Sequence, residues 1–553
     1  MATGGDAVAR VLAENGVTHV FTLLGNQTVS IAQGLTTRGV AVITARHEYN
    51  AAVMADTYGR LTGDPGVVLT VAGPGGTNAL TGIAQAYAAM SPVLCISAVL
   101  PETAPPESLH GVDDPHLLAH VFDDATKWST QVHDATRLPE TLNRAFDVAT
   151  SGRPGPVFVG IDEEILMGEV ELPESRFAWT HHDDAPVAPD TVVTALNALR
   201  GRNRRVLYVG KGVSRAFAGD IVVDIAEALD CPVVCPRHYP DSFPNDHRLY
   251  AGSVGMADHP AASVALRTAE TVLSLGVRVD SHEAAVLDDR TPDEAELVFF
   301  ATGPREPTRI PAFAVVSGDL HTTLRVARDE LQRDPGETAT EYRENVLAEA
   351  ERVRDAIADY YEAVREQVPI HPLFVLQTLR AVADDDVIVT GDAGAAGGAW
   401  PNDAFEFRAV NSFQHSRLYD SMGFPVPAGN AAKLVFPDRQ VVNLVGDGGM
   451  LMCVMELATA VETDTNAVTV VLNDAKYGMI WNYQRSRGYE EVGTTNPPID
   501  FAAIARGFGV NGVRVETPEA FRPALEDALT ADRHTVLDVV IDPEAAYVSR
   551  KVW

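Results

Sequence analysis

Short apolar runs rich in β-branched residues alternate with helical patterns along most of the chain. In the first part of the chain a helical pattern over residues 5–15 precedes such runs at 19–23, 40–45, 67–71, 93–98 and 157–161. Strands that alternate with helices form parallel sheets flanked by helices. The pattern therefore predicts an α/β domain over residues 1–170, followed by a proline-containing linker over residues 173–189.

The same alternation returns twice. A second unit starts at Arg205, contains the runs VLYVG, VVCP and VLSLGV, and fades near FAVVSGDL. A charged helical stretch over residues 336–364 then leads to a third unit near His371, with apolar runs at 387–390, 441–445, 468–472 and 536–541. We expect three doubly wound parallel-sheet α/β domains, over residues 1–170, 190–335 and 365–553.

The two outer domains share an order of segments. Residues 67–98 and residues 441–474 each contain an apolar run, a glycine-rich turn, an apolar helical pattern and a second apolar run. Because the crossover between parallel strands is right-handed, both strands of such a unit end at one sheet edge, where open α/β sheets bind ligands. Two such edges can face a single ligand.

Composition narrows the classes of function. Of the 553 residues, 46% are hydrophobic and 22% are charged, which is typical of a globular protein. The formal net charge of -33 opposes binding to nucleic acid and to anionic membranes. No apolar run reaches the roughly 18 residues of a membrane span, and the N-terminus lacks the pattern of a signal peptide, so a cytoplasmic protein is expected.

Four cysteines in so long a chain do not form a disulfide framework. Cys231, Cys235 and His238 have the residue types of a zinc site. The run CPVVCP is better explained as a buried strand, and no second ligand pair follows at finger-like spacing. The sequence therefore predicts no zinc site on these residues.

A glycine-rich turn in the third domain is the first candidate for chemistry. Gly446, Asp447, Gly448 and Gly449 directly follow an apolar run, so their backbone can approach a phosphate closely. Asp474 stands 27 residues after Asp447, at the end of the next predicted strand. One crossover thus brings two carboxylates to one edge, and Mg²⁺ is typically held by one or two carboxylates plus phosphates. The alternative is structural: Asp447 begins a turn and Asp474 caps a helix.

This spacing resembles the thiamine diphosphate motif, whose two halves here have the sequences GDGGM and NDAKYGM. The resemblance implies that Asp447 and Asp474 are side-chain ligands of Mg²⁺ and that the main-chain carbonyl of Lys476 is the third ligand. It also implies that both halves bind the cofactor, through Gly446, Asp447, Gly448, Gly449, Met450, Asp474, Lys476, Tyr477, Gly478 and Met479.

Further segments resemble the acetolactate synthase, pyruvate oxidase and benzaldehyde lyase branch of the thiamine diphosphate-dependent enzymes, over essentially the whole chain. RHEYNAAVMADTYGR resembles the segment whose glutamate, here Glu48, contacts the aminopyrimidine ring. TVAGPGGTNALTG, with Gly73 and Asn78, resembles the glycine turn and helix beside the cofactor. DSMGFPVPAG places Met422 where an apolar residue holds the cofactor bent. The branch implies a cofactor-binding fold in both outer domains and a Rossmann-like central domain.

Two regions depart from that branch. Where its members carry a Gly-Gln-His run, this chain has GDAGAAGGAW, so Gly394, Ala395 and Ala396 stand at the cofactor without those polar groups. Biosynthetic acetolactate synthases carry an arginine-containing loop and a flavin in the central domain. Residues 276–286 do not match that loop, so FAD is doubtful for this chain.

Two further polar residues are candidates for the catalytic site. His110 is the first choice for a polar group over the cofactor, ahead of His116 and His120, although a lone histidine is more often structural. Gln27 follows the first strand, where family members place substrate contacts. A simple turn explains Gln27 equally well.

The resemblance implies carbanion chemistry. Glu48, hydrogen-bonded to the pyrimidine, would favour the tautomer whose nitrogen deprotonates thiazolium C2, while the cofactor performs the bond chemistry. We expect an enzyme that decarboxylates a small 2-oxo acid, ligates the acyl carbanion equivalent to a carbonyl acceptor, or does both. The alternatives are a non-decarboxylating 2-hydroxyketone lyase or carboligase with an aldehyde or ketone substrate, and a non-catalytic regulatory or binding protein. A homodimer or homotetramer with active sites between subunits is also implied.

Overall fold

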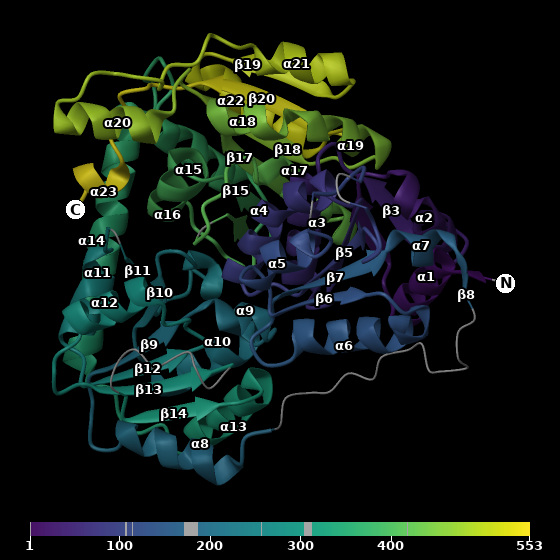
Figure 1. Cartoon of the computed structure of the whole chain (residues 1–553). Helices are drawn as coiled ribbons and strands as arrows, with labels where there is room; N and C mark the ends of the chain where they lie inside the picture. Colours follow the sequence, from purple (N-terminus) through teal and green to yellow (C-terminus); the bar gives the residue numbers. More distant parts are fainter. Residues whose placement is uncertain are drawn as a thin grey trace.

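The structure is a computed structural model that describes residues 2–105, 108–112, 114–170, 186–255, 257–302, 312–416 and 418–553. Three successive parts of the chain each contain a six-stranded, all-parallel sheet flanked by helices (Figure 1). The predicted fold class of three doubly wound α/β units is therefore confirmed. Most of the predicted linker over residues 173–189 lies outside the described residues.

The N-terminal sheet has the strand order β3-β2-β4-β5-β7-β6. Its strands are β2 (His19–Thr22), β3 (Ala41–Thr44), β4 (Gly66–Thr70), β5 (Val93–Val99), β6 (Trp128–Val132) and β7 (Pro156–Asp162). Its helices are α1 (Gly4–Glu14), α2 (Val29–Thr36), α3 (Glu48–Thr62), α4 (Pro74–Ala88), α5 (Leu117–Asp123), α6 (Leu138–Thr150) and α7 (Glu163–Met167). A short antiparallel pair, β1 (Ala2–Thr3) with β8 (Glu169–Val170), joins the two ends of this unit.

The central sheet has the strand order β11-β10-β9-β12-β13-β14. Its strands are β9 (Arg205–Val209), β10 (Val233–Pro236), β11 (Tyr250–Val254), β12 (Thr271–Leu275), β13 (Glu296–Ala301) and β14 (Ala314–Ser317). Its helices are α8 (Pro189–Leu196), α9 (Lys211–Arg215), α10 (Gly219–Leu229), α11 (Pro260–Arg267), α12 (Ser281–Arg290) and α13 (Leu320–Arg333). Both Cys231 and Cys235 are buried in its core, as the strand interpretation of CPVVCP predicts.

The C-terminal sheet has the strand order β16-β15-β17-β18-β20-β19. Its strands are β15 (Ile388–Gly391), β16 (Phe413–His415), β17 (Val441–Gly446), β18 (Val468–Asn473), β19 (Asn511–Val515) and β20 (Thr535–Val540). Its helices are α15 (Pro372–Val382), α16 (Trp400–Ala404), α17 (Pro425–Val435), α18 (Asp447–Cys453), α19 (Leu457–Glu462), α20 (Gly478–Arg487), α21 (Phe501–Phe508), α22 (Pro518–Leu529) and α23 (Val548–Lys551).

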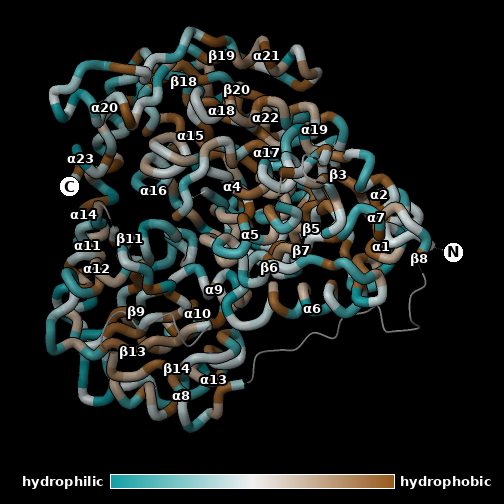
Figure 2. Tube along the Cα trace, viewed as in Figure 1, coloured by the Kyte–Doolittle hydropathy of each residue, from teal (hydrophilic) through white to brown (hydrophobic). Residues whose placement is uncertain are grey.

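The long helix α14 (Thr340–Val364) connects the central and C-terminal units, as the charged stretch in the sequence predicts. In Figure 1 it runs along the left side, from the central unit at the bottom toward the C-terminal unit at the top. Hydrophobic residues follow the interior strands such as β9 and β13, while hydrophilic residues follow much of the outer surface (Figure 2). Strands buried on both faces carry nearly continuous apolar runs, which explains why the sequence locates them.

Five strands of the three six-stranded sheets are not among those the sequence predicts: β6, β11, β13, β16 and β19. Four of them, β6, β11, β16 and β19, stand at the edge of their sheets. An edge strand has one open side, and β19, for example, is largely exposed. Its mixture of polar and apolar residues therefore gives no clear apolar run. The strand β13 is interior and apolar, and nothing in the structure explains why the apolar pattern misses it.

Candidate functional site

A cavity of about 240 Å³ lies at the carboxyl edge of the C-terminal sheet, where β15, β17 and β18 end. Most residues that the sequence assigns to cofactor binding in this domain line it: Gly394, Ala395, Ala396, Met422, Gly446, Asp447, Gly448, Gly449, Asp474, Lys476, Tyr477, Gly478 and Met479. Met450 does not line it, because its side chain is buried in a core cluster under the sheet. The predicted sheet edge and the cavity thus coincide.

Glycines at the strand ends allow the chain to turn tightly around this cavity. A Cβ atom on Gly448 would lie 2.4 Å from the ring of Tyr477, and one on Gly449 would lie 1.7 Å from a carboxylate oxygen of Asp392. A Cβ atom on Gly478 would lie 2.6 Å from Asp474 Oδ2. Any side chain at these three positions would therefore displace a residue of the site.

The two carboxylates of the motif meet at the cavity. Asp447 is buried and accepts a hydrogen bond of 2.9 Å from Asn496 Nδ2, while Asp474 is half-buried and accepts one of 3.1 Å from the Lys476 main-chain N–H. Burial raises the pKa of Asp447. Burial and the neighbouring charge of Asp447 raise the pKa of Asp474 to about 7. Two carboxylates held together in this way favour a bound cation or proton between them.

Met422 sits in the cavity on a loop whose main chain is fixed from two directions. Asp392 Oδ1 accepts hydrogen bonds from the N–H groups of Gly423 (2.9 Å) and Phe424 (3.3 Å). The Tyr49 hydroxyl donates to the Met422 carbonyl at 3.0 Å. Asp392 is buried, which raises its pKa to about 7.

Two further residues of the site, Asp392 and Asn496, are not among those that the sequence predicts. A signal for Asp392 exists, because GDAG follows β15 in the same way that GDGG follows β17. Both aspartates stand at the carboxyl ends of neighbouring parallel strands. Asn496 comes from a loop after α20, and no pattern in the sequence relates it to Asp447.

Small residues form one wall of the cavity. Gly394 has a φ of 86°, a conformation that L residues rarely adopt, and it opens a wide π-type turn over Ala395–Ala399. The turn passes so close to β15 that a Cβ atom on Gly397 would lie 1.8 Å from the Asp392 main-chain nitrogen. Ala395 and Ala396 therefore present only methyl groups to the cavity.

Glu48 begins α3 in the N-terminal domain and is buried. Asn78 Nδ2 donates to Glu48 Oε2 at 3.0 Å, so the structure brings these two predicted cofactor residues together. Gly73 precedes α4 with a φ of 62°, and a Cβ atom there would lie 2.2 Å from the His110 carbonyl oxygen. None of Glu48, Gly73 and Asn78 lines the cavity at the C-terminal sheet of the same chain.

Gln27 is buried, and its side chain is fully engaged. Its Oε1 accepts the Ala72 main-chain N–H at 2.9 Å, and its Nε2 donates to Glu163. Gln27 thereby fixes the turn that contains Gly73. Its role in substrate contact remains a prediction, which rests only on its position after β2 at the carboxyl edge of the N-terminal sheet.

The three candidate histidines occupy different surroundings. His110 is exposed, has a φ of 67° and meets the Gly73 turn through its backbone. His116 is half-buried and bonds Gln131 at 2.6 Å. His120 is exposed and bonds Asp114 at 3.0 Å. Of the three, His110 is the one that touches the Gly73 turn.

Family models match three successive parts of the chain. They are described as thiamine pyrophosphate enzyme, N-terminal TPP binding domain (residues 2–116), central domain (residues 192–326) and C-terminal TPP binding domain (residues 392–539). The acetolactate synthase large subunit of Parasynechococcus marenigrum is 30% identical to this chain, over 97% of the chain and 87% of its own length. The chain belongs to the thiamine pyrophosphate enzymes.

Other relatives align over nearly the whole length of this thiamine pyrophosphate enzyme. The acetolactate synthase of Bacillus subtilis is 29% identical over 98% of the chain and 93% of its own length. The probable acetolactate synthase large subunit of Methanocaldococcus jannaschii is 29% identical over 98% of the chain and 92% of its own length. The chain is thus a thiamine diphosphate-dependent enzyme of the acetolactate synthase-like branch. Within the described residues, no helix is long and apolar enough to cross a membrane.

Proposed function

We propose that this enzyme uses thiamine diphosphate and Mg²⁺ to decarboxylate a small 2-oxo acid, to ligate the acyl carbanion equivalent to a carbonyl acceptor, or to do both. The observation that carries the proposal is the pairing of Asp447 with Asp474 beside a glycine-lined cavity. The similarity to proteins named acetolactate synthase supports a 2-oxo acid as the substrate.

The donor set suits a magnesium diphosphate. Asp447 and Asp474 are hard oxygen donors, and a bound Mg²⁺ would stabilise both ionised carboxylates against the burial that raises their pKa values and against the charge of Asp447 that further raises the pKa of Asp474. The Lys476 ammonium lies 3.5 Å from the centre of the Trp481 ring, so this side chain is occupied and its main-chain carbonyl remains the proposed third ligand. The glycines at 446, 448 and 449 let the backbone approach the phosphates.

When bound, thiamine diphosphate supplies a nucleophilic carbon and an electron sink. The residues of this chain would orient the cofactor and hold one of its protons. Glu48, oriented by Asn78, holds a proton at N1′ of the pyrimidine. Met422, on the loop that Asp392 and Tyr49 fix, would pack against the bound cofactor. Ala395 and Ala396 would give the cofactor site an apolar wall and help to exclude water from it.

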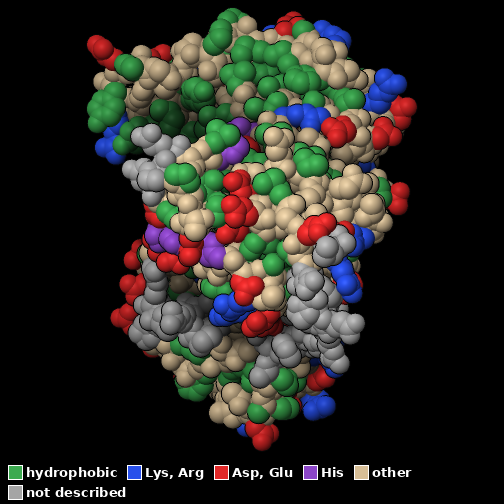
Figure 3. All heavy atoms as spheres, turned by 45° about the vertical axis from the view of Figure 1, so that its right-hand side comes forward, with side chains coloured by type: hydrophobic (Ala, Val, Ile, Leu, Met, Phe, Trp, Pro, Cys, Tyr) green, Lys and Arg blue, Asp and Glu red, His purple; other side chains and the backbone are tan. Residues whose placement is uncertain are grey.

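The active site is proposed to lie between two copies of the chain, because Glu48 does not line the cavity of its own chain. Exposed hydrophobic side chains flank both halves of the site: Leu24, Leu109 and Val112 near the Gly73 turn, and Leu451, Met452, Met479 and Ile480 near the cavity. Figure 3 shows hydrophobic side chains gathered over the upper part of the molecule, where the C-terminal domain lies in Figure 1. Such patches are typical of subunit interfaces.

Incubation of the enzyme with thiamine diphosphate, Mg²⁺ and pyruvate tests the reaction. We expect release of carbon dioxide and formation of acetolactate, both lost when Asp447 is replaced by asparagine. A panel of small 2-oxo acids covers other substrates. Cleavage of a 2-hydroxy ketone without gas release from any 2-oxo acid would instead identify a non-decarboxylating lyase.

A further inference from the structure

Three potential metal ligands lie together in the central domain, at the carboxyl edge of its sheet. His238 follows β10, and His282 and Glu283 open α12 after β12. In the sheet order β10 and β12 flank β9, so the group lies over the central strand. Within the described part of the chain, it is the one group of three or more His, Cys, Asp or Glu side chains whose donor atoms all lie within 4.8 Å of one another.

Neighbouring residues hold the donors in orientation. Glu283 Oε2 accepts a hydrogen bond from the Tyr208 hydroxyl of β9, which leaves Oε1 facing His238 Nδ1 at 3.9 Å. Asp280 Oδ1 accepts the main-chain N–H groups of His282 (2.9 Å) and Glu283 (3.0 Å), which fixes the start of α12. Carboxylates and imidazoles that bind metals usually have such supporting partners.

The donor atoms have few protein partners within the described part of the chain. His282 Nε2 is buried and has no hydrogen-bond partner among the described residues. A Cβ atom on Gly255 would be in van der Waals contact with this nitrogen, at 3.5 Å, so the glycine keeps that side of the imidazole free of a side chain. Glu283 is 4% exposed, and among the described residues His238 is its one ion-pair partner. A buried carboxylate and an unpaired buried imidazole nitrogen are costly unless a further group binds between them.

We propose that His238, His282 and Glu283 bind a divalent transition-metal ion, with Zn²⁺ as the best match. Two imidazole nitrogens and one carboxylate oxygen form a common zinc donor set, whereas Mg²⁺ and Ca²⁺ prefer oxygen alone. Donors of a tetrahedral zinc ion lie about 3.4 Å apart, so donor atoms that lie within 4.8 Å of one another have to close by up to about 1.4 Å. His238 is partly exposed, and rotation of its side chain can supply that movement. A water molecule would complete the coordination from the solvent side.

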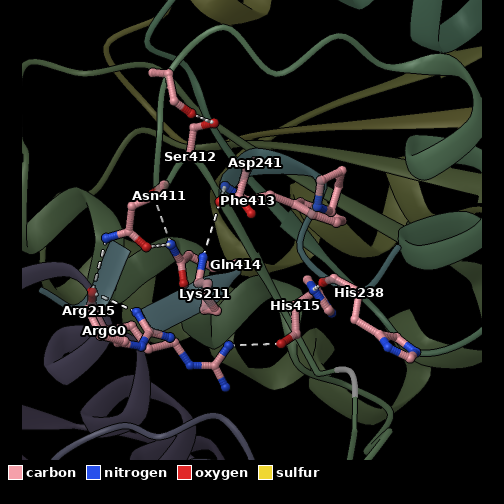
Figure 4. A network of polar contacts seen from close by, with 12 residues as sticks. Arg60, Lys211, Arg215, His238, Asp241, Asn411, Ser412, Phe413, Gln414 and His415 are labelled. Atoms are coloured by element: carbon pink, nitrogen blue, oxygen red, sulfur yellow. Dashed lines mark hydrogen bonds and ion pairs between the residues drawn. The ribbon is translucent and has the colours of Figure 1, made fainter. Parts of the chain in front are cut away.

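The ion would be structural and distinct from the Mg²⁺ at Asp447 and Asp474. It would join the end of β10 to the start of α12 next to a junction of all three domains. Figure 4 shows this junction: His238 lies beside His415, whose ring nitrogen contacts the His238 carbonyl. Arg60 of the N-terminal domain donates to the His415 carbonyl at 2.8 Å. Fixing His238 would therefore stabilise the contact of the central domain with the C-terminal domain, whose His415 also meets the N-terminal domain.

Titration of the holoenzyme, saturated with thiamine diphosphate and Mg²⁺, with Co²⁺ tests this site. Tetrahedral Co²⁺ on nitrogen and oxygen donors absorbs visible light, and Zn²⁺ should abolish the band by displacement. We expect one equivalent per chain, lost in both His238→Gln and His282→Gln. His247→Gln is the matched control, because Glu227, at 3.5 Å, is the one acidic partner of His247 among the described residues, and this variant should bind Co²⁺ like the unaltered enzyme.

A substitution outside the donor set separates metal binding from mere folding. Tyr208→Phe removes the hydroxyl that orients Glu283 and should weaken Co²⁺ binding about 10–100-fold while one equivalent still binds at saturation. Absence of the visible band, or unchanged Co²⁺ binding in both histidine variants, would overturn the proposal. A thiolate charge-transfer band would overturn it too, by assigning the ion to a cysteine. If His282→Gln does not fold, the outcome for the partly exposed His238→Gln decides.

Discussion

Replacement of Asp392 by asparagine removes one buried ionisable group and keeps the shape of the side chain. Asp392 holds the loop of Met422 through two main-chain N–H groups, and an asparagine carbonyl can accept the same bonds. Burial raises the pKa of the Asp392 carboxyl from 3.8 to about 7. The substitution therefore isolates the free energy of ionising this group inside the folded protein.

The raised pKa of Asp392 determines the sign and the size of the change in the free energy of unfolding. Between pH 3.8 and about 7 the unfolded chain has released this proton while the folded chain retains it, so the free energy of unfolding falls as the pH rises. Each pH unit costs about 1.4 kcal/mol, and the whole interval costs about 4 kcal/mol. The cofactor-free Asp392→Asn variant should thus match the unaltered protein near pH 4 and exceed its stability by up to about 4 kcal/mol at pH 8.

Urea unfolding followed by tryptophan fluorescence, in EDTA from pH 4 to 8, measures this difference. The gap between the two proteins should widen steadily up to pH 7 and then stay constant. Asp385→Asn is the control: Asp385 is exposed and Arg408 lowers its pKa, so this variant should show no such widening. Parallel pH profiles for Asp392→Asn and the unaltered protein would refute the idea that Asp392 stays protonated in the fold.

Three further predictions concern single residues. Glu48→Gln should still bind thiamine diphosphate but lose exchange of the C2 proton, measured by NMR in deuterated solvent; unchanged exchange would exclude the role of Glu48. Gly449→Ala should lower the free energy of unfolding by about 3 kcal/mol, the upper end of the usual cost of overpacking, measured in urea, because its Cβ overlaps Asp392. Burial lowers the pKa of His534 from 6.5 to about 4, so stability present above pH 6.5 is lost as the pH falls. His534→Gln should reduce that acid loss by about 3 kcal/mol, and an unchanged acid titration would contradict it.

Much of the fold follows from the apolar runs, and the exceptions have physical causes. Interior strands such as β5 and β18 are buried along their whole length and have the apolar sequences that burial requires. The edge strands β6 and β19 are partly open to solvent, so their sequences are mixed. An apolar run indicates a buried strand, and strands at a sheet edge are only partly buried. The apolar pattern therefore does not identify these edge strands.

The sequence predicts the site residues that stand at the ends of adjacent strands. It does not predict those that reach the site from distant loops. Asp447 and Asp474 follow neighbouring strands, and the predicted crossover brings them together. Asn496 reaches Asp447 from a separate loop, and Gln27 is held by Glu163 from another part of the domain. His238 meets His282 and Glu283 only because β10 and β12 flank β9, an order that the sequence alone does not give.

Complementation between two inactive variants tests the composite active site. In the proposed dimer each site takes Glu48 from one chain and Asp447 from the other, so Glu48→Gln and Asp447→Asn disable every site in their homodimers. A heterodimer of the two variants carries one intact site and one doubly altered site. Equal amounts of both chains, unfolded and refolded together, should recover about one quarter of the unaltered activity per chain. If the mixture is as inactive as each variant alone, although heterodimers are detected, Glu48 and Asp447 act within one chain.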